Sequence, residues 1–324
     1  EDDATTEADD GGTVLGTMRD AVCFFRKSRA PAVPPRRPIR KTFHFSGESM
    51  NKLVKKLMLV AAMLMLAAGP SFAADAIRIG LMCPLTGKWA SEGQDMQQIV
   101  SLLVSEVNKA GGINGKQIEL IVEDDAGDPR TASLAAQKLA SAGVMAVIGT
   151  YGSAVTEASQ NIIDEAEIMQ IATGSTSVRL TEKGLPLFFR TCPRDDEQGR
   201  VASKVIAAKG FKKVAILHDN SAYAKGLADE AKQRILDKKS ADIVFFDALV
   251  PGERDYSAIL TKIKGVKPDA ILFTGYYPEA GLLLRQMQEM KWAVPIIGGD
   301  ATNNTDLVKI AGDAAAGYRF ISPI

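Results

Sequence analysis

Short apolar runs alternate with segments of helical length from residue 76 to the end of the chain. Most runs are continuously apolar, as strands of a parallel sheet are when helices cover both faces. They lie at 77–82, 117–125, 144–150, 168–174, 213–219, 242–250, 270–276, 294–300 and 317–322. Because parallel strands need a crossover of roughly a dozen residues, the segments between them are predicted to be helices. The pattern predicts an α/β protein with right-handed crossovers.

The helices are expected from Glu92, over 131–142 and 153–165, and from Asp196, Tyr223, Tyr256, Glu279 and Asn304. In the first helix the apolar residues repeat at helical spacing and predict one apolar face, made of Met96, Ile99, Val100, Leu103 and Val107. Gly111 and Gly112 supply the stop for this helix.

Two such series of strands and helices follow one another, which predicts two Rossmann-like lobes joined near residues 190–195. In an open parallel sheet, ligands bind outside the carboxyl ends of the strands. The loops expected there are rich in small polar and aromatic residues, and they include CPLTGKWASEG, YGSAVTEAS, GSTS, HDNSAYAKG, GYYPEAG and GGDATNN. Two lobes with such rims predict a ligand cleft between them.

A segment typical of a secretory signal peptide stands at 50–73, well inside the chain. Met50 opens a stretch with three lysines, an apolar run follows over 57–68, and SFA supplies small residues at a cleavage site. A membrane-spanning helix needs roughly 20 apolar residues, and a buried core helix would not explain the lysines. We therefore expect a signal peptide and a mature chain that begins at Ala74.

Residues 1–49 open with an acidic run and continue basic and proline-rich, a composition that cannot bury enough apolar surface to fold. Because a signal peptide is read near the N-terminus, we hypothesise that translation starts at Met50 and that residues 1–49 are a translation artefact. A lipid anchor is not expected, because no cysteine follows the apolar run before Cys83.

The part after residue 73 has nearly balanced charge, with 28 Lys and Arg (39 − 11) against 31 Asp and Glu (39 − 8). Such a balance does not favour nucleic-acid binding. Its two cysteines, Cys83 and Cys192, are far apart in the sequence and are both expected to be free. With His218 as its single histidine, neither a Ser-His-Asp triad nor a transition-metal site is expected.

Enzyme motifs are also missing from the sequence. GGINGK lacks the Ser or Thr of a phosphate-binding loop, no GxGxxG follows the first strand, and YGSAV does not form a nucleophile elbow. We therefore expect a binding protein rather than an enzyme, with no cofactor.

Nine stretches stand in order along residues 76–324, namely PLTG, NKAGGINGKQIEL, EDDAGDP, VIGTYGS, RLTEKG, RTCPRDDEQG, HDNSAYAKGLA, VPGERDYSAIL and GYYPEAGLLLRQ. Together they resemble the periplasmic leucine/isoleucine/valine-binding protein family, the solute-binding components of branched-chain amino acid ABC transporters. The resemblance implies a type I periplasmic binding protein fold, whose two lobes close about a hinge. It also implies a periplasmic monomer, a free L-amino acid of the Leu, Ile or Val type as ligand, and an ABC transporter permease as partner.

In the first lobe, the resemblance carries ligand roles onto three positions. Ser153 matches a serine whose hydroxyl and N–H hold the ligand carboxylate, Gly174 matches a carbonyl that accepts from the ligand ammonium, and Thr176 matches a threonine that touches both groups. Ser153 also opens a predicted helix, whose N-terminus favours an anion. The alternative for Ser153 and Thr176 is helix capping and turn formation.

In the second lobe, Tyr223 and Tyr276 match tyrosines of the side-chain pocket, and Asp300 matches an acid that pairs with the ammonium. The best-known members have glutamate at the position of Asp300. An ammonium that leaves water needs such an anion and full hydrogen bonding. The alternatives are ordinary packing for the tyrosines and capping of the helix near Asn304 for the aspartate.

The sequence departs from the family near the expected ligand. Best-known members carry an aromatic residue where this chain has Glu92, and Trp89 is the candidate to replace that aromatic wall. Tyr151 stands where an apolar residue meets the ligand side chain. The cysteines that some members join in a disulfide are replaced here by Gly127 and Gly152. These departures put the preferred amino acid in question more than the binding mode.

Members of the family continue well past the point where this chain stops, so we expect a truncated chain. Its first lobe (74–192) should be incomplete and leave apolar surface uncovered, and its second lobe (193–317) should be followed by a crossover back at 318–324. An amino acid binding protein linked to transport is favoured, because Asp300 and the hydroxyl groups suit a zwitterion. A sensor or binding protein of the same fold for an amide, urea or aromatic acid, and a non-functional fragment, are the alternatives.

Overall fold

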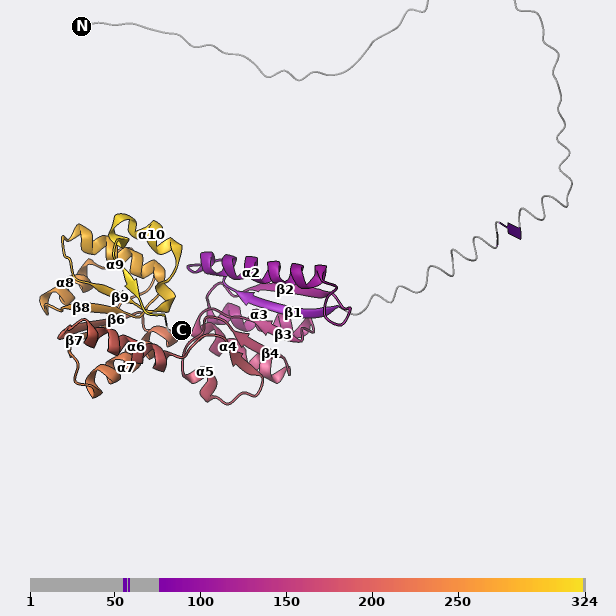
Figure 1. Cartoon of the computed structure of the whole chain (residues 1–324), viewed down its shortest axis with the longest axis horizontal. Coiled ribbons are helices and arrows are strands. Elements are labelled where there is room, and N and C mark those ends of the chain that lie inside the picture. Colours follow the sequence, from indigo (N-terminus) through magenta and orange to yellow (C-terminus); the bar gives the residue numbers. More distant parts are fainter. Residues whose placement is uncertain (1–54, 57, 59–75, 323–324) are drawn as a thin grey trace, which may run out of the picture. The chain divides into compact units, whose positions relative to one another are not determined.

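Residues 76–322 carry the fold, and the computed structural model also describes residues 55, 56 and 58 (Figure 1). The expected signal peptide at 50–73 and the segment at 1–49 therefore lie almost wholly outside the described residues. The residues from 76 onward belong to one compact unit that contains two sheets, one in each lobe. Within the described part of the chain, no helix is both long enough and apolar enough to span a bilayer.

The first lobe is built on five parallel strands in the order β2-β1-β3-β4-β5. The strands are β1 (Ile77–Cys83), β2 (Ile118–Asp124), β3 (Ala146–Ile148), β4 (Met169–Ala172) and β5 (Phe188–Arg190). The helices between them are α2 (Ala90–Lys109), α3 (Pro129–Ser141), α4 (Ser153–Glu165) and α5 (Arg179–Glu182). Because β1 pairs with β2 on one side and with β3 on the other, the chain order reverses at β1 and β3.

The second lobe repeats this plan with the strand order β10-β9-β8-β6-β7, again all parallel. The strands are β6 (Lys213–His218), β7 (Asp242–Ala248), β8 (Ala270–Phe273), β9 (Ile296–Gly298) and β10 (Arg319–Phe320). The helices are α6 (Asp195–Ala208), α7 (Ala222–Asp237), α8 (Ser257–Gly265), α9 (Tyr277–Glu289) and α10 (Thr305–Ala311), with 3₁₀ turns η1 (Asp300–Thr302) and η2 (Gly312–Ala315). Here the order reverses at β6 and β8.

The position of β6 between two layers of helices explains why the sequence of this strand is apolar throughout. Val214 and Ile216 join one apolar cluster together with α6 and α7, whereas Ala215 and Leu217 join the cluster on the opposite face with α8 and α9. Successive side chains of a strand point to opposite faces, so burial of all four requires helices on both sides. Figure 1 shows these two helix layers, with α6 and α7 on one side of the sheet and α9 and α10 on the other.

The apolar face expected on the first helix is present on α2, but most of it is not buried. Ile99 is 60% exposed, Leu103 is 54% exposed, and Gly93 is the one buried residue of the described helix. The face is therefore present as predicted, and Ile99 and Leu103 remain exposed on it. Helices α3 and α4 pack on the other face of the sheet, around buried residues such as Leu139 and Ile163.

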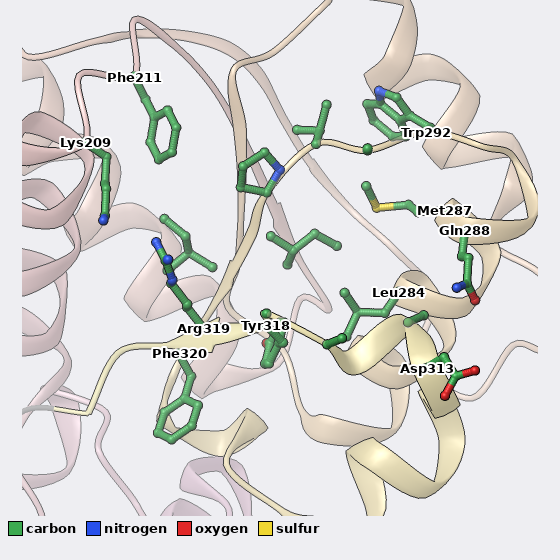
Figure 2. Close-up of a pocket in the computed structure, with 18 of the residues that line it drawn as sticks. Lys209, Phe211, Leu284, Met287, Gln288, Trp292, Asp313, Tyr318, Arg319 and Phe320 are labelled. Atoms are coloured by element: carbon green, nitrogen blue, oxygen red, sulfur yellow. The ribbon is translucent and has the colours of Figure 1, made fainter.

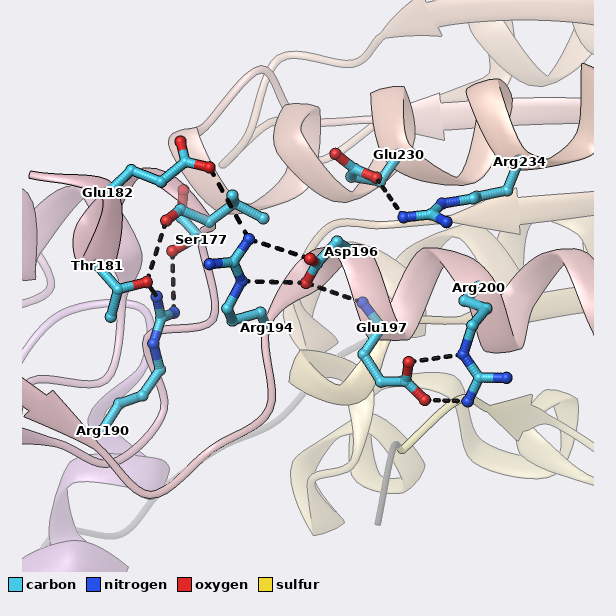
Figure 3. Close-up of polar contacts among 11 residues, drawn as sticks. Ser177, Thr181, Glu182, Arg190, Arg194, Asp196, Glu197, Arg200, Glu230 and Arg234 are labelled. Carbon is cyan, nitrogen blue, oxygen red and sulfur yellow. Dashed lines mark hydrogen bonds and ion pairs between the residues drawn. The ribbon is translucent and has the colours of Figure 1, made fainter. Parts of the chain in front are cut away.

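A short segment leads from β5 to α6 and joins the lobes inside the range predicted from the sequence. At its start Arg190 donates to the carbonyl oxygen of Ser177 at 2.9 Å and to the hydroxyl of Thr181 at 2.6 Å (Figure 3). At its end the guanidinium of Arg194 pairs with Asp196 at 3.0 Å, in the first turn of α6. The two arginines thus anchor one end of the link to each lobe.

Three details differ from the sequence expectation. Residues 188–190 add a strand that the pattern did not predict, and residues 319–320, expected both as part of a last strand and as part of a crossover, pair with β9 of the second sheet. Helix α9 begins at Tyr277 rather than Glu279, because Pro278 fits the first turn of a helix. The expectation for Cys83 and Cys192 is met, since both are free.

Candidate functional site

The points where strand order reverses bring four aromatic side chains together between the lobes. Trp89 follows β1, Tyr151 follows β3, Tyr223 lies just beyond β6, and Tyr276 follows β8. The ring centroid of Tyr276 lies 4.2 Å from that of Trp89 and 5.2 Å from that of Tyr223. The loops on either side of such a reversal diverge and leave a crevice, which is the usual ligand site of open α/β sheets.

A cavity of about 190 Å³ lies at this aromatic group and is lined from both lobes. Its lining residues are Glu92, Tyr151, Thr173, Gly174, Cys192, Tyr223, Tyr276, Asp300, Ala301, Asn303 and Ser322. Within the described part of the chain, the lining contains no lysine or arginine and no aliphatic side chain larger than alanine. The cavity therefore offers carboxylates, hydroxyls, amide groups and aromatic faces.

Five of the eight residues expected at the ligand site line this cavity, namely Tyr151, Gly174, Tyr223, Tyr276 and Asp300. Ser153, Thr176 and Trp89 do not line it. Sequence reasoning missed Thr173, Cys192, Asn303 and Ser322 as lining residues and treated Glu92 only as a departure from the family. Thr173 could have been found, because it directly follows β4 at the carboxyl end of the sheet.

Asp300 is the acidic group of the second lobe at the cavity. The hydroxyl of Tyr223 donates to its Oδ1 at 2.7 Å, and the N–H of Ala301 donates to the same oxygen at 2.9 Å. Burial raises the pKa of Asp300, and the hydrogen bond from Tyr223 opposes this rise. Asn304, not Asp300, caps α10 by accepting from Asp306. Both donors use Oδ1, so Oδ2 remains for another partner.

Ser153 and Thr176 are buried inside the first lobe instead of facing the cavity. The hydroxyl of Ser153 accepts from the N–H of Ser177 at 3.1 Å, which ties the start of α4 to the loop after β4. The hydroxyl of Thr176 has no hydrogen-bond partner among the described residues. Thr173, which does line the cavity, also has an unpartnered buried hydroxyl among these residues. The first lobe thus holds free hydroxyl groups next to the cavity.

Trp89 fills the space between two glycines. An added Cβ on Gly127 would lie 2.6 Å from the indole ring, and one on Gly152 would lie 2.7 Å from it. These are the positions where some relatives carry the two cysteines of a disulfide. In this chain the indole packs against both backbones, so any side chain at either position would displace it. Trp89 also stacks edge-on against Tyr151, with ring centroids 5.6 Å apart.

Polar contacts join the lobes at the mouth of the cavity. The hydroxyl of Tyr277 in the second lobe donates to the carbonyl oxygen of Lys88 in the first lobe at 3.0 Å. Ser91 donates to the same hydroxyl at 3.1 Å, and the amide of Asn304 donates to Glu92 at 3.1 Å. The loop before α2 and the first turn of α2 therefore close against the second lobe.

Asp195, the first residue of α6, is a buried acid between the lobes that the sequence did not single out. Its N–H donates to the carbonyl oxygen of Thr176 at 3.0 Å, whereas its two carboxyl oxygens have no partner with good geometry among the described residues. Burial raises the pKa of Asp195 to about 8, and the nearby Asp300 adds to the rise while Thr176 and Arg190 oppose it. A neutral carboxyl group is thus favoured there.

A second cavity, of about 970 Å³, lies wholly within the second lobe beside β10 (Figure 2). Its lining is mostly apolar and includes Phe211, Leu284, Met287, Trp292 and Phe320. None of the eight residues expected at the ligand site lines it. It is larger than the cavity between the lobes, but it does not combine an acidic group with free hydroxyl groups from both lobes.

Within the described residues, no cluster of His, Cys, Asp and Glu is arranged to hold a metal ion. The groups at the cavity between the lobes are therefore suited to recognition by hydrogen bonds and charge. They match a small ligand that carries a cation for Asp300 and an acceptor for hydroxyl groups.

Comparison with known proteins agrees with this arrangement. Residues 76–324 match the model of a family described as periplasmic binding protein. The Leu/Ile/Val-binding protein BraC3 of Rhizobium johnstonii is 40% identical over 257 residues, which cover 79% of this chain and 69% of that protein. The leucine-, isoleucine-, valine-, threonine-, and alanine-binding protein of Pseudomonas aeruginosa is 36% identical over 272 residues, which cover 83% of this chain and 72% of that protein.

A solved structure shows the same fold. The branched-chain amino acid transporter substrate binding protein LivJ of Streptococcus pneumoniae, determined in complex with isoleucine, superposes with a TM-score of 0.69. The two chains are 35% identical, and the match covers 74% of this chain and 68% of that one. The prediction of two parallel-sheet α/β lobes of the type I periplasmic binding protein fold is confirmed.

Proposed function

The chain belongs to the periplasmic binding protein family, and from this premise we propose that it captures a branched-chain or similar aliphatic amino acid between its lobes and delivers it to an ABC transporter. Relatives whose names record binding of leucine, isoleucine and valine support this ligand class. Membership of a family of binding proteins also supports the expectation that the chain is not an enzyme.

One observation carries the proposal. A cavity at the switch points of both sheets combines Asp300, which has one oxygen free of protein donors, with the unpartnered hydroxyl of Thr173 from the other lobe. An amino acid zwitterion presents a cation to the first group and an anion to the second. Because charge-assisted hydrogen bonds are the strong ones, this pairing suits a zwitterion better than a neutral amide or urea.

The proposed roles follow from these positions. Asp300 and the carbonyl of Gly174 receive the ammonium, and the hydroxyl of Thr173 binds the carboxylate. The rings of Tyr223 and Tyr276 surround the aliphatic part of the ligand. Ser153, Thr176 and Trp89 act from behind the lining, where they support the first-lobe loops. Closure of the lobes excludes water and strengthens each of these contacts.

We further propose that the chain is exported to the periplasm as a monomer through a signal peptide cleaved before Ala74, and that a membrane permease receives the ligand. The family supports a location outside the cytoplasm. The mass of the exported chain tests the cleavage. A chain that begins at Ala74 supports it, and an exported chain that keeps residues 50–73 contradicts it.

Thermal unfolding with a panel of free amino acids tests the ligand class. A ligand that binds only the folded state raises its stability by about 2.7 kcal/mol at a concentration of 100 times Kd. We expect the midpoint to rise with L-leucine, L-isoleucine or L-valine, and not with D-leucine, which carries the same charges in the wrong geometry. A rise with an amide, urea or an aromatic acid, and with no L-amino acid, would favour the sensor alternative.

A further inference from the structure

Two carboxyl groups, one from each lobe, line the same small cavity. Asp300 comes from the second lobe and Glu92 from the first turn of α2 in the first lobe. The amide of Asn304 donates to Oε2 of Glu92 at 3.1 Å, and no other side chain among the described residues donates to this carboxyl group. One oxygen of each acid is thus without a protein donor. The ammonium of a bound amino acid is already assigned to Asp300 and the carbonyl of Gly174, which leaves Glu92 available to a donor on the ligand side chain.

The small number of apolar side chains in the lining also indicates a ligand with a polar side chain. Within the described residues, no Leu, Ile, Val, Met or Phe lines it, and its apolar contacts come from tyrosine rings, Ala301 and Cys192. A pocket that selects a purely aliphatic side chain is built mostly from apolar side chains, with few polar groups. The lining also contains three polar side chains that have no proposed role toward the ligand's ammonium or carboxylate, namely Glu92, Asn303 and Ser322.

An unpaired carboxylate at Glu92 is unfavourable when the lobes close around a ligand and exclude water. Burial raises the pKa of Glu92, the hydrogen bond from Asn304 opposes this rise, and the carboxylates of Asp95 and Asp300 add to it. No lysine or arginine lines the cavity within the described part of the chain. Glu92 is only partly buried. When closure around a ligand excludes water, an acceptor left without a donor loses free energy, so a ligand that supplies the donor gains affinity over one that does not.

We infer that the preferred ligand is an amino acid whose side chain carries a hydrogen-bond donor, and that Glu92 accepts from this donor. The inference rests on the proposed capture of an amino acid between the lobes, and it replaces the aliphatic side chain of that proposal with a polar one. The donor is either a hydroxyl group, as in threonine, or an ammonium, as in ornithine. Glu92 is then a specificity-determining residue, and it discriminates against aliphatic ligands of equal size.

Isothermal titration of the chain with L-threonine, L-valine and L-ornithine tests the inference. Threonine and valine have nearly the same shape, so their affinity ratio isolates the hydroxyl group. We expect threonine or ornithine to bind about tenfold more tightly than valine, or better, because a site built to bond a hydroxyl rejects the analogue that lacks it. Valine binding as tightly as both polar ligands, or more tightly, would overturn the inference and leave the proposed function standing.

Variants of Glu92 assign the effect to this residue. Glu92→Leu should remove the preference for the polar ligand, whereas Glu92→Gln, which keeps an acceptor oxygen without the charge, should retain a preference for threonine and lose one for ornithine. Glu106→Leu and Glu106→Gln change an exposed acid near the other end of the same helix and should leave every ratio unchanged. Glu92→Gln also keeps the test usable if Glu92→Leu does not fold.

The possible failures can be told apart. An unchanged ratio of threonine to valine in Glu92→Leu would overturn the role of Glu92. Binding of no amino acid by the wild-type chain would overturn the proposed function, and this inference with it.

Discussion

The two lobes share one strand plan, yet they meet the cavity with different chemistry. The first lobe contributes small groups at strand ends, such as Thr173 and Gly174, and it lets Trp89 pack behind them. The second lobe contributes tyrosine rings and the half-buried acid Asp300. Repetition of a fold therefore does not repeat its site. Under the proposed function, a ligand with two opposite charges needs both lobes, and we expect both to contact it when they close.

The lobes also differ in how completely they are packed. The central strands β6 and β8 of the second sheet are buried on both faces, whereas the α2 side of the first lobe exposes Ile99 and Leu103. Burial of an apolar side chain contributes about 1.5–3 kcal/mol relative to exposure, so the first lobe is expected to be the less stable half.

The largest effect is expected where the second lobe supplies charge. Asp300→Asn keeps the shape of the side chain but removes the anion that pairs with the ligand ammonium. We expect affinity for an L-amino acid to fall about 100-fold, because loss of one partner leaves a buried charge unpaired. Isothermal titration measures the change, with Asp313→Asn as a control on an exposed part of the same lobe. If Asp300→Asn left the affinity unchanged, the claim that the second lobe binds the ligand ammonium through Asp300 would be wrong.

The next effect is expected in the first lobe, where space rather than charge is limiting. A Cβ on Gly174 would lie 2.7 Å from Cδ2 of Tyr151 and 3.0 Å from its carbonyl oxygen. Gly174→Ala should therefore cost about 1–3 kcal/mol through overpacking and reduce affinity about tenfold. Gly265→Ala, where an added Cβ meets nothing within 4 Å, should leave both quantities unchanged. If Gly174→Ala and Gly265→Ala changed stability and affinity equally, the claim that space is limiting around Gly174 would be wrong.

The carboxyl group of Asp195, buried at the boundary between the lobes, predicts how the stability of the chain depends on pH. Its pKa is raised to about 8 in the folded chain, against about 3.9 when unfolded, so the folded state binds more protons between these values. Stability should therefore fall as pH rises through this window. Asp195→Asn should remove the slope and raise stability at neutral pH by about 1–3 kcal/mol.

The neighbouring residue provides a matched control for this prediction. Asp196 is ion-paired with Arg194 on the surface. Burial is the largest single influence and raises its pKa, but the hydrogen bond and charge of Arg194, with the N–H of Glu197, together lower the pKa below its usual value. Asp196→Asn should be neutral or destabilise by about 0.5 kcal/mol. Denaturant unfolding at several pH values compares the two variants. A slope that persists in Asp195→Asn would show that another group causes it.

The smallest effect is expected at the contacts that close the lobes. Tyr277→Phe removes the hydroxyl that reaches Lys88 across the cavity mouth, and should weaken ligand binding by about 1 kcal/mol, or a few-fold. Tyr256→Phe removes a comparable hydrogen bond to Val250 inside the second lobe. It should lower stability without changing affinity once the chain is folded. A larger affinity loss in Tyr256→Phe would contradict the assignment of closure to Tyr277.

Much of the fold could be predicted from periodicity, because strands buried on both faces must be apolar throughout. The three-residue strand β5 escaped this reasoning, since FFR is too short and too charged at its end to form a periodic run. Periodicity also predicted the apolar face of α2, although spacing shows only that apolar residues share a face and not whether anything covers it.

The site was predictable to the level of loops, and less so to the level of side chains. Strand ends predicted which loops would meet, which is why Tyr151 and Tyr276 line the cavity together. The direction of a hydroxyl group depends on local hydrogen bonds that a sequence does not display. Ser153 therefore turned out to bond Ser177, while Thr173, three residues before Thr176, lines the cavity.

The most direct measurement is titration of the chain with an L-amino acid and with its two halves. For leucine these are 4-methylpentanoate, which lacks the ammonium, and isoamylamine, which lacks the carboxylate. If binding needs both Asp300 of the second lobe for the ammonium and Thr173 of the first lobe for the carboxylate, only the complete amino acid should bind with measurable affinity, and each half should be weaker by about 100-fold or more. Equal binding of either half and the whole would contradict the claim that the two lobes divide the recognition of a zwitterion.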